Sequence, residues 1–226
     1  MDFNNHVQNY SNQVQQAISV TSVKHEIFLA EKADQLINLS RQQFGDLGKV
    51  RVLDVGCGVG LLEDALIGNF KRLVGVDIAP EVIQRAKDRV HSAEFFLYDG
   101  FNLPFQDSEF DLVFACCVFH HIPPEHRLSI AQDMARVCSK GGLIVIFEHN
   151  PLNPATRLIV SRCEFDQDAV LLNSLESKKL LSQVGLKRIF CRQILYFPWR
   201  NRFFKLLEKF ISWIPMGAQY VVYSTK

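Results

Sequence analysis

Apolar residues stand at helical spacing in the first part of this chain and then gather into short runs typical of strands. Between Lys24 and Phe44 they recur every three or four positions, which predicts a helix that stops before Gly45 and Gly48. Five apolar runs follow and predict strands at Val50–Val55, Arg72–Val76, Ala93–Leu97, Leu112–Val118 and Leu143–Phe147. Helical patterns between them cover Leu61–Ile67, Pro80–Val90 and Glu125–Cys138. This alternation predicts an α/β fold with a parallel sheet.

The strand runs are apolar at nearly every position, which is expected for a sheet covered by helices on both faces. Lys140, Gly141 and Gly142 have the composition of a stop for the helix before them. After Glu148 the alternation is interrupted by a proline-containing segment over 150–170, which we interpret as an insertion. The remaining elements are predicted in chain order as a helix at Ser174–Val184, a strand at Leu186–Cys191, an amphipathic stretch at Phe203–Ile214 and a strand at Gln219–Ser224.

Composition narrows the class of protein. The chain has 226 residues, of which 48% are apolar, so one domain with a sizeable core is expected. Because 25 Lys and Arg balance 24 Asp and Glu, there is no overall charge signature of nucleic-acid binding. The polar start lacks the pattern of a signal peptide, and no apolar run is long enough to span a membrane, so a cytoplasmic protein is expected. The six cysteines lack metal-site spacing, and we expect neither a metal nor disulfides.

A glycine loop over 54–60, with the sequence DVGCGVG, follows the first strand and precedes a helix. Open α/β sheets bind ligands at this position, and glycines allow the backbone to approach a ligand closely. A dinucleotide would require a small residue where Leu61 stands, and the carboxylate of Asp54 would repel its pyrophosphate. S-adenosylmethionine carries positive charge and no phosphate, so it suits this loop better. The alternative is a purely structural tight turn.

Two further acidic residues follow the next two strands. Asp77 lies about twenty residues past the loop, where a carboxylate can accept hydrogen bonds from ribose hydroxyls. Asp99 could accept a hydrogen bond from an adenine amino group, and Gly100 leaves room beside it. Taken alone, Asp77 could be a helix cap and Asp99 with Gly100 a turn.

Five motifs, LDVGCGVG, VGVDIAP, YDGFNLPF, FDLVFACCVFHHI and SKGGLIVIFEH, together resemble the class I S-adenosylmethionine-dependent methyltransferases. The resemblance is strong over 50–147 and is closest to the branch that includes quinone-biosynthesis enzymes. It implies a Rossmann-like, doubly wound seven-stranded sheet, mostly parallel with an antiparallel last strand, and S-adenosyl-L-homocysteine as product. It further implies a single domain made of an N-terminal helical cap (1–48), in which Tyr10 and the segment around it form a lid, a donor-binding core (49–148) and acceptor-side elements (149–226).

The same resemblance assigns donor-binding roles by position. The methionine portion of the donor is assigned to the loop and to the backbone of Cys116, and the ribose to Asp77. Ile78 is assigned to one face of the adenine, and Asp99 with Gly100 to its edge. The loop residues concerned are Asp54, Val55, Gly56, Cys57 and Gly58.

His120 and His121 follow the fourth strand and are expected to face the ligand crevice. Methyl transfer mainly requires alignment of the two substrates and exclusion of water. A hydroxyl acceptor also needs a base, for which His121 or His120 is placed best and His149 next. The alternative is that the paired histidines only pack and hydrogen-bond locally.

The acceptor is expected to be a small molecule. The segment from Lys187 to Lys209 contains seven Lys or Arg but only one acidic residue, Glu208, and aromatic residues are interleaved with them. An anionic or lipid-like acceptor, or peripheral contact of 203–214 with an anionic membrane surface, would explain this segment, and so would an ordinary solvated helix. We expect no nucleic-acid partner. The alternatives to an enzyme of this kind are a binding or regulatory protein without turnover and a nicotinamide-dependent oxidoreductase.

Overall fold

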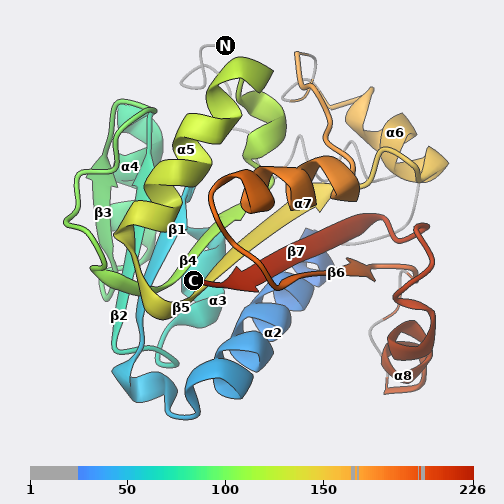
Figure 1. Cartoon of the computed structure of the whole chain (residues 1–226), viewed down its shortest axis with the longest axis horizontal. Helices are drawn as coiled ribbons and strands as arrows, with labels where there is room; N and C mark the ends of the chain where they lie inside the picture. The colour runs from blue at the N-terminus through green and yellow to red at the C-terminus, as the bar shows by residue number, and fades with distance from the viewer. Residues whose placement is uncertain (1–24, 164–165, 167, 198, 200–201) are drawn as a thin grey trace.

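A seven-stranded sheet forms the centre of the computed structural model, which describes residues 25–163, 166, 168–197, 199 and 202–226 (Figure 1). The spatial order is β3-β2-β1-β4-β5-β7-β6. Strands β1 to β5 are parallel, and β7 runs antiparallel between β5 and β6. The fold prediction is therefore confirmed. The strands are β1 Arg51–Val55, β2 Arg72–Asp77, β3 Glu94–Leu97, β4 Phe110–Cys116, β5 Cys138–His149, β6 Ile189–Ile194 and β7 Gln219–Thr225.

Helices cover both faces of this sheet. On one face lie α2 (His25–Phe44) and α3 (Leu61–Leu66), and on the other α5 (Pro124–Val137) and α7 (Ser174–Gln183). Helix α4 (Pro80–Arg89) packs against β2 and β3. The remaining helical elements are η3 (Leu47–Lys49), η4 (Phe119–His121), α6 (Pro154–Val160) and α8 (Arg202–Ile211).

Strand β1 illustrates why the strand runs are apolar throughout. Val52 packs on the α2 and α3 face, whereas Leu53 and Val55 pack on the α5 and α7 face, and none of the three is exposed. Burial of each such side chain contributes roughly 1.5–3 kcal/mol. Both faces of the central strands therefore belong to the core. The loops that follow these parallel strands meet at the carboxyl edge of the sheet.

Two predicted boundaries are wrong. Strand β5 begins at Cys138, directly after α5, so Gly141 and Gly142 lie inside the strand and do not end the helix. Their role is a bend, because Gly141 has φ +78° and a Cβ on Gly142 would come within 2.8 Å of two backbone oxygens. The strand expected at 186–191 is shifted to 189–194.

Segment 150–170 contains a helix that the apolar pattern did not reveal. The Asn153 side chain accepts hydrogen bonds from the backbone N–H groups of Ala155 and Thr156, and Pro154 occupies the first turn of α6. These are ordinary helix-start signals. They were overlooked because the helix is too short to show periodicity. Within the part of the chain that the structure describes, none of the helices combines the length and the apolar character needed to cross a bilayer.

Candidate active site

The loops at the carboxyl ends of the parallel strands surround a cavity of about 570 Å³. It lies where the strand order reverses, between β1 and β4, which is the usual ligand position in open α/β sheets. Helix α2 contributes Phe28, Leu29 and Lys32 to its wall, and α6 contributes Thr156 and Ile159. One cavity therefore joins the predicted donor loop to the elements expected beside an acceptor.

The glycine loop has a backbone that other residues would not adopt easily. Gly56, Gly58 and Gly60 have φ values of +83°, +55° and +75°. A Cβ on Gly56 would stand 2.4 Å from a methyl group of Val118. The turn and the close approach both require glycine, so the loop exposes backbone to the cavity.

Asp77, at the end of β2, holds this loop. Its Oδ2 accepts a hydrogen bond from the backbone N–H of Gly58 at 3.0 Å, and its Oδ1 accepts from Ala79 at 3.1 Å. Burial raises the pKa of Asp77, and these two hydrogen bonds oppose that rise. Asp77 therefore holds both the glycine loop and the turn into α4, and it lines the cavity. It does not cap α4, because the N-cap of that helix is Ala79 and no side chain bonds to it there.

Asp54 lies beneath the loop and is 2% exposed. Its Oδ1 has no hydrogen-bond partner among the described residues, nor has either oxygen of buried Glu63 in the first turn of α3. Burial, and next the neighbouring carboxyl of Glu63, raise the pKa of Asp54 well above its usual value. Burial also raises the pKa of Glu63 to about 7. Asp54 thus offers an unpartnered acceptor at the cavity floor, which suits a cationic group.

Replacement of Glu63 by glutamine is expected to stabilise the ligand-free protein above pH 7. The folded-state pKa of Glu63 lies above its usual 4.5, so its favourable contribution is present below pH 4.5 and is lost as pH rises through 7. Glutamine cannot ionise, so the variant does not lose stability in this way. The free energy of unfolding should rise by roughly 3 kcal/mol at pH 8 and by much less at pH 4.5. Urea denaturation at both values, with exposed Glu81→Gln as control, measures this; an equal change at both pH values would contradict it.

Of the other residues predicted to bind the donor, all but Val55 line the cavity. Gly56, Cys57, Gly58, Ile78, Asp99, Gly100 and Cys116 line the same cavity as Asp54 and Asp77. Val55 instead is fully buried among the apolar residues on the α5 and α7 face and does not line it. The carboxylate of Asp99 accepts from the backbone N–H groups of Phe101 and Asn102 at 2.8 and 2.7 Å, so it also organises its own turn. Tyr10 lies outside the described residues.

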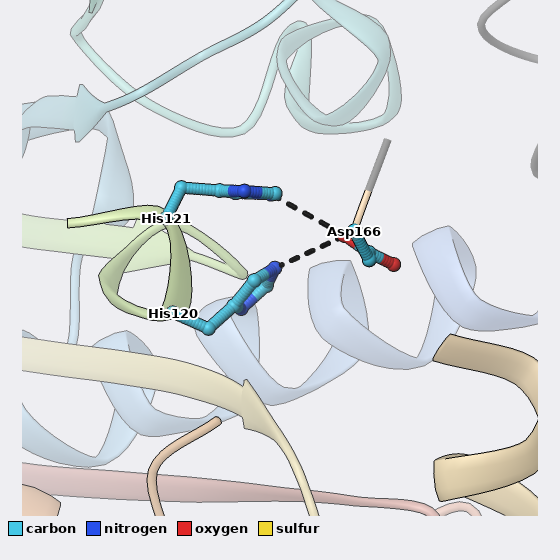
Figure 2. A group of neighbouring side chains, drawn as sticks. All are labelled: His120, His121 and Asp166. Atoms are coloured by element: carbon cyan, nitrogen blue, oxygen red, sulfur yellow. Dashed lines mark ion pairs between the residues drawn. The ribbon is translucent and has the colours of Figure 1, made fainter. Parts of the chain in front are cut away.

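His120 is fixed between two carboxylates. Its Nδ1 lies 2.5 Å from Glu148 Oε2 at the end of β5, and its Nε2 lies 3.4 Å from Asp166 Oδ1 (Figure 2). Glu148 also accepts from the backbone N–H of Phe119. Burial opposes a charge on His120, but Glu148 and Asp166 outweigh it and raise its pKa to about 10. His120 is therefore a buried imidazolium whose two ring nitrogens are both engaged.

His121 has the opposite electrostatic character. Its Nε2 also points to Asp166 Oδ1, at 3.4 Å (Figure 2). Burial, and next the charge of His120, lower the pKa of His121 to about 4. At neutral pH this imidazole is uncharged, and it lines the cavity. Of the adjacent pair, His121 is the one whose protonation state suits a base.

Cys117 follows β4 with a left-handed backbone, φ +58°. Its sulfur accepts from Lys32 Nζ at 3.3 Å and from Gln219 Nε2 at 3.6 Å, and Gln219 in turn contacts His149. A hydrogen bond with Cys116, and the nearby charges of Lys32 and His149, lower the pKa of Cys117 well below its usual value, although burial opposes them. Lys32, Cys117 and Gln219 thus form a polar cluster in the cavity wall.

One further property of the histidine cluster concerns metal binding. Ligand atoms of His120, His121 and Asp166 lie within 4.8 Å of one another, a spacing that a divalent cation could use. The ion pairs described above already engage these atoms, and we assign no metal to them.

Sequence reasoning missed Lys32, Glu63, Glu148 and Asp166. Asp166 belongs to the segment 150–170 that we interpreted only as an insertion. Two hydrogen bonds hold this segment beside the histidines: the backbone N–H of Val170 donates to the carbonyl of His120, and the Arg127 side chain donates to the carbonyl of Val170. Glu148 stands directly after the apolar run that predicts the fifth strand. A charged side chain in that position requires a partner when it is buried, and this signal could have identified Glu148 as a site residue.

Comparison with known proteins identifies the family. A family model described as a methyltransferase domain matches residues 53–146. An uncharacterized methyltransferase of Synechocystis is 31% identical over 140 residues, covering 60% of this chain and 66% of that protein. A ubiquinone biosynthesis O-methyltransferase of Xanthomonas euvesicatoria is 27% identical over 173 residues, covering 70% of this chain and 71% of that protein.

A crystal structure of an S-adenosylmethionine-dependent methyltransferase from Archaeoglobus fulgidus shares the fold, with a TM-score of 0.62 and 16% identity over 90% of this chain and all of that one. In four curated relatives, the match covers only 29 to 66% of the relative's own length. These matches agree with the motifs of the glycine loop, β2 and β4, and with the topology of the sheet. Residues 53–146 therefore form a methyltransferase domain, and the chain has the fold of S-adenosylmethionine-dependent methyltransferases.

Proposed function

We propose that this protein transfers a methyl group from S-adenosylmethionine to a small-molecule acceptor. The observation that carries the proposal is the shared cavity, which is lined both by the glycine loop with Asp77 and by His121 with Asp166. A donor held on the loop and an acceptor held beside His121 would meet inside one cavity, where positioning and exclusion of water favour the transfer.

The residues present fit the donor. The unpartnered Oδ1 of buried Asp54 suits its positive charge, and the glycines leave room for close approach. Asp54, with the backbone of Gly56, Gly58 and Cys116, would hold the methionine portion. Asp77 would hold the ribose, Ile78 the adenine face, and Asp99 with Gly100 the adenine edge. When bound, the donor supplies a methyl carbon activated by the adjacent sulfonium.

The contribution of His121 is to accept the proton of a hydroxyl acceptor. A neutral imidazole that donates Nε2–H to Asp166 carries its lone pair on Nδ1, and we assign proton acceptance to that atom. Its low pKa keeps the ring uncharged at neutral pH and therefore able to accept a proton, and a phenol, being more acidic than an aliphatic alcohol, demands less of so weak a base. Asp166 orients the ring, and the imidazolium of His120 fixes Asp166 in place.

The wall of the acceptor end favours an amphiphilic molecule. Phe28, Leu29, Ile122 and Ile159 supply apolar surface there, and Lys32 supplies a buried cation. An apolar acceptor with an anionic or acidic oxygen matches both features. The ubiquinone biosynthesis relative, whose name indicates an O-methyltransferase, supports an acceptor of this class.

Ligand-induced stabilisation followed by a transfer assay tests the function. S-adenosylmethionine and S-adenosyl-L-homocysteine should each raise the unfolding temperature, and NAD should not. With isotopically labelled donor, label should enter phenolic or quinol-type lipids extracted from bacterial membranes. Stabilisation by NAD alone would favour an oxidoreductase, and donor binding without transfer to any metabolite pool would favour a binding protein.

His121→Asn is expected to lower turnover with little change in donor affinity. Loss of a positioned base typically costs roughly 100-fold to 10,000-fold in rate. Donor affinity from titration calorimetry should stay within about threefold of the unmodified protein, since His121 faces the acceptor end. The matched control is His126→Asn, a second cavity histidine packed edge-on against Phe101. Equal turnover in both variants and in the unmodified protein would exclude His121 as the base.

A further inference from the structure

Helix α8 and the residues around it expose an apolar stripe to solvent. Phe203, Phe210 and Trp213 are 68, 70 and 79% exposed, and Leu206 lies between them at 57%. Positions 203, 206, 207, 210 and 213 share one side of a helix. Trp199, at the other end of α8, is also exposed. In Figure 1, α8 stands apart at the lower right, beyond the helices that cover the sheet.

Helix α8 is joined to the rest of the protein through hydrogen bonds. Glu208 accepts hydrogen bonds from the backbone N–H groups of Tyr196 and Phe197. The Tyr196 hydroxyl donates to the carbonyls of Ile211 and Ile214, and Gln193 N–H donates to Ser212. A surface helix normally buries its apolar side and exposes its polar side. Here Phe203, Leu206 and Phe210 face outward instead, and exposed apolar surface of this kind marks an interaction site.

Charge identifies that partner. Residues 187–209 contain seven Lys or Arg, and their only acidic residue, Glu208, is engaged by the protein's own backbone. The segment is therefore basic as well as apolar, which is the combination that binds anionic lipid headgroups. Trp199 and Trp213, the only two tryptophans of the chain, stand on either side of α8. Tryptophan favours the boundary between headgroups and acyl chains.

This docking surface adjoins the acceptor end of the cavity. The chain after α8 accepts hydrogen bonds from residues at the start of α6: Asn150 donates to the carbonyls of Pro215 and Gly217, and Thr156 donates to that of Ala218. Thr156 and Ala218 line the cavity. Leu152, beside them in sequence, is 55% exposed. A membrane that touches α8 would therefore lie close to the entry for an acceptor.

We propose that α8, with Trp199 and Trp213, docks in the plane of an anionic lipid membrane, and that the acceptor is an amphiphile taken from that membrane. The second half of this proposal rests on the proposed function. The first half depends only on α8 and stands without it.

Vesicle binding tests the docking surface. The protein should bind phosphatidylcholine vesicles that contain phosphatidylglycerol more tightly than pure phosphatidylcholine vesicles, and the difference should shrink as salt is raised. Phe203→Ser combined with Phe210→Ser should weaken binding by roughly tenfold or more, because two inserted aromatic side chains are lost. The matched control replaces two exposed apolar residues elsewhere, Leu97→Ser and Leu175→Ser, and should leave binding unchanged.

Two outcomes would overturn docking on a membrane. One is equal or absent vesicle binding by the unmodified protein and both variants. The other is self-association in sedimentation velocity that Phe203→Ser with Phe210→Ser abolishes, because α8 would then bind a second copy. Thermal stabilisation by S-adenosyl-L-homocysteine is measured on the same samples. It should be unchanged in the α8 variants, so a failure of donor binding is distinguished from a failure of docking.

Discussion

Replacement of Glu148 by glutamine is expected to lower the free energy of unfolding by roughly 3–5 kcal/mol at pH 7. Glu148 is fully buried, and it accepts hydrogen bonds from His120 Nδ1 and from the backbone N–H of Phe119. A glutamine can keep only one of these bonds, because its amide nitrogen cannot accept a proton donor. His120 would then lose one of the two carboxylates that balance its charge in the interior. Urea denaturation of both proteins measures the difference.

The same variant should change the pH dependence of stability. The folded-state pKa of His120, about 10, lies above its usual 6.5, so its favourable contribution is fully present below pH 6.5 and is lost as pH rises toward 10. This corresponds to roughly 5 kcal/mol. Glu148, Asp166, Cys117 and the rings of His121 and His149 face His120. The stability difference between the unmodified protein and Glu148→Gln should therefore narrow from pH 7 to pH 10.

Glu94→Gln provides the contrast for a carboxylate that pairs at the surface. Glu94 bonds Arg72 at 2.8 Å, but its side chain is 48% exposed. Water screens such pairs, so its loss should cost less than about 1 kcal/mol. A loss of similar size for Glu94→Gln and Glu148→Gln, or a constant difference between pH 7 and 10 for Glu148→Gln, would contradict the buried imidazolium.

The donor side of the site could be predicted because its information is local. Gly56, Gly58 and Asp77 all follow strand runs, and the parallel order of the sheet brings strand ends to one edge. Spacing along the chain is then sufficient to bring Asp77 to the loop. The parallel order of the first five strands followed from the same alternation, whereas the seven-stranded sheet with an antiparallel last strand came from the family resemblance.

The acceptor side could not be predicted because its contacts are long-range. Asp166 meets His120 and His121 only through the path of segment 150–170, which carries no periodic pattern. Glu63, in a first helical turn, has the position of a solvated acid near a helix dipole, yet it is buried against Asp54. The sequence proposed His121 or His120 as the base and indicated no charge state for either. Only their different carboxylate partners separate a charged His120 from a neutral His121.

Asp77→Asn is expected to weaken binding of S-adenosylmethionine by about 100-fold or more. The carboxylate of Asp77 holds the N–H groups of Gly58 and Ala79, and we assign the ribose hydroxyls to the same group. Hydrogen bonds to a charged acceptor contribute roughly 1.5–3 kcal/mol each, and about 1.4 kcal/mol corresponds to tenfold in affinity. An asparagine amide would also point a donor at one of the two N–H groups, so the loop would lose a contact as well. Titration calorimetry with S-adenosyl-L-homocysteine measures the loss.

Asp99→Asn is the informative comparison, because both residues are acidic, follow neighbouring strands and line the same cavity. Asp99 is bonded to three donors within its own exposed turn, and asparagine supports such turns almost as well as aspartate. Its replacement should therefore weaken donor binding by less than about tenfold. If both variants lost affinity equally while their unfolding temperatures stayed unchanged, the orientation of the donor would be anchored at its adenine end. If only Asp77→Asn lost affinity, the main anchor of the donor would be Asp77 and the loop that it holds.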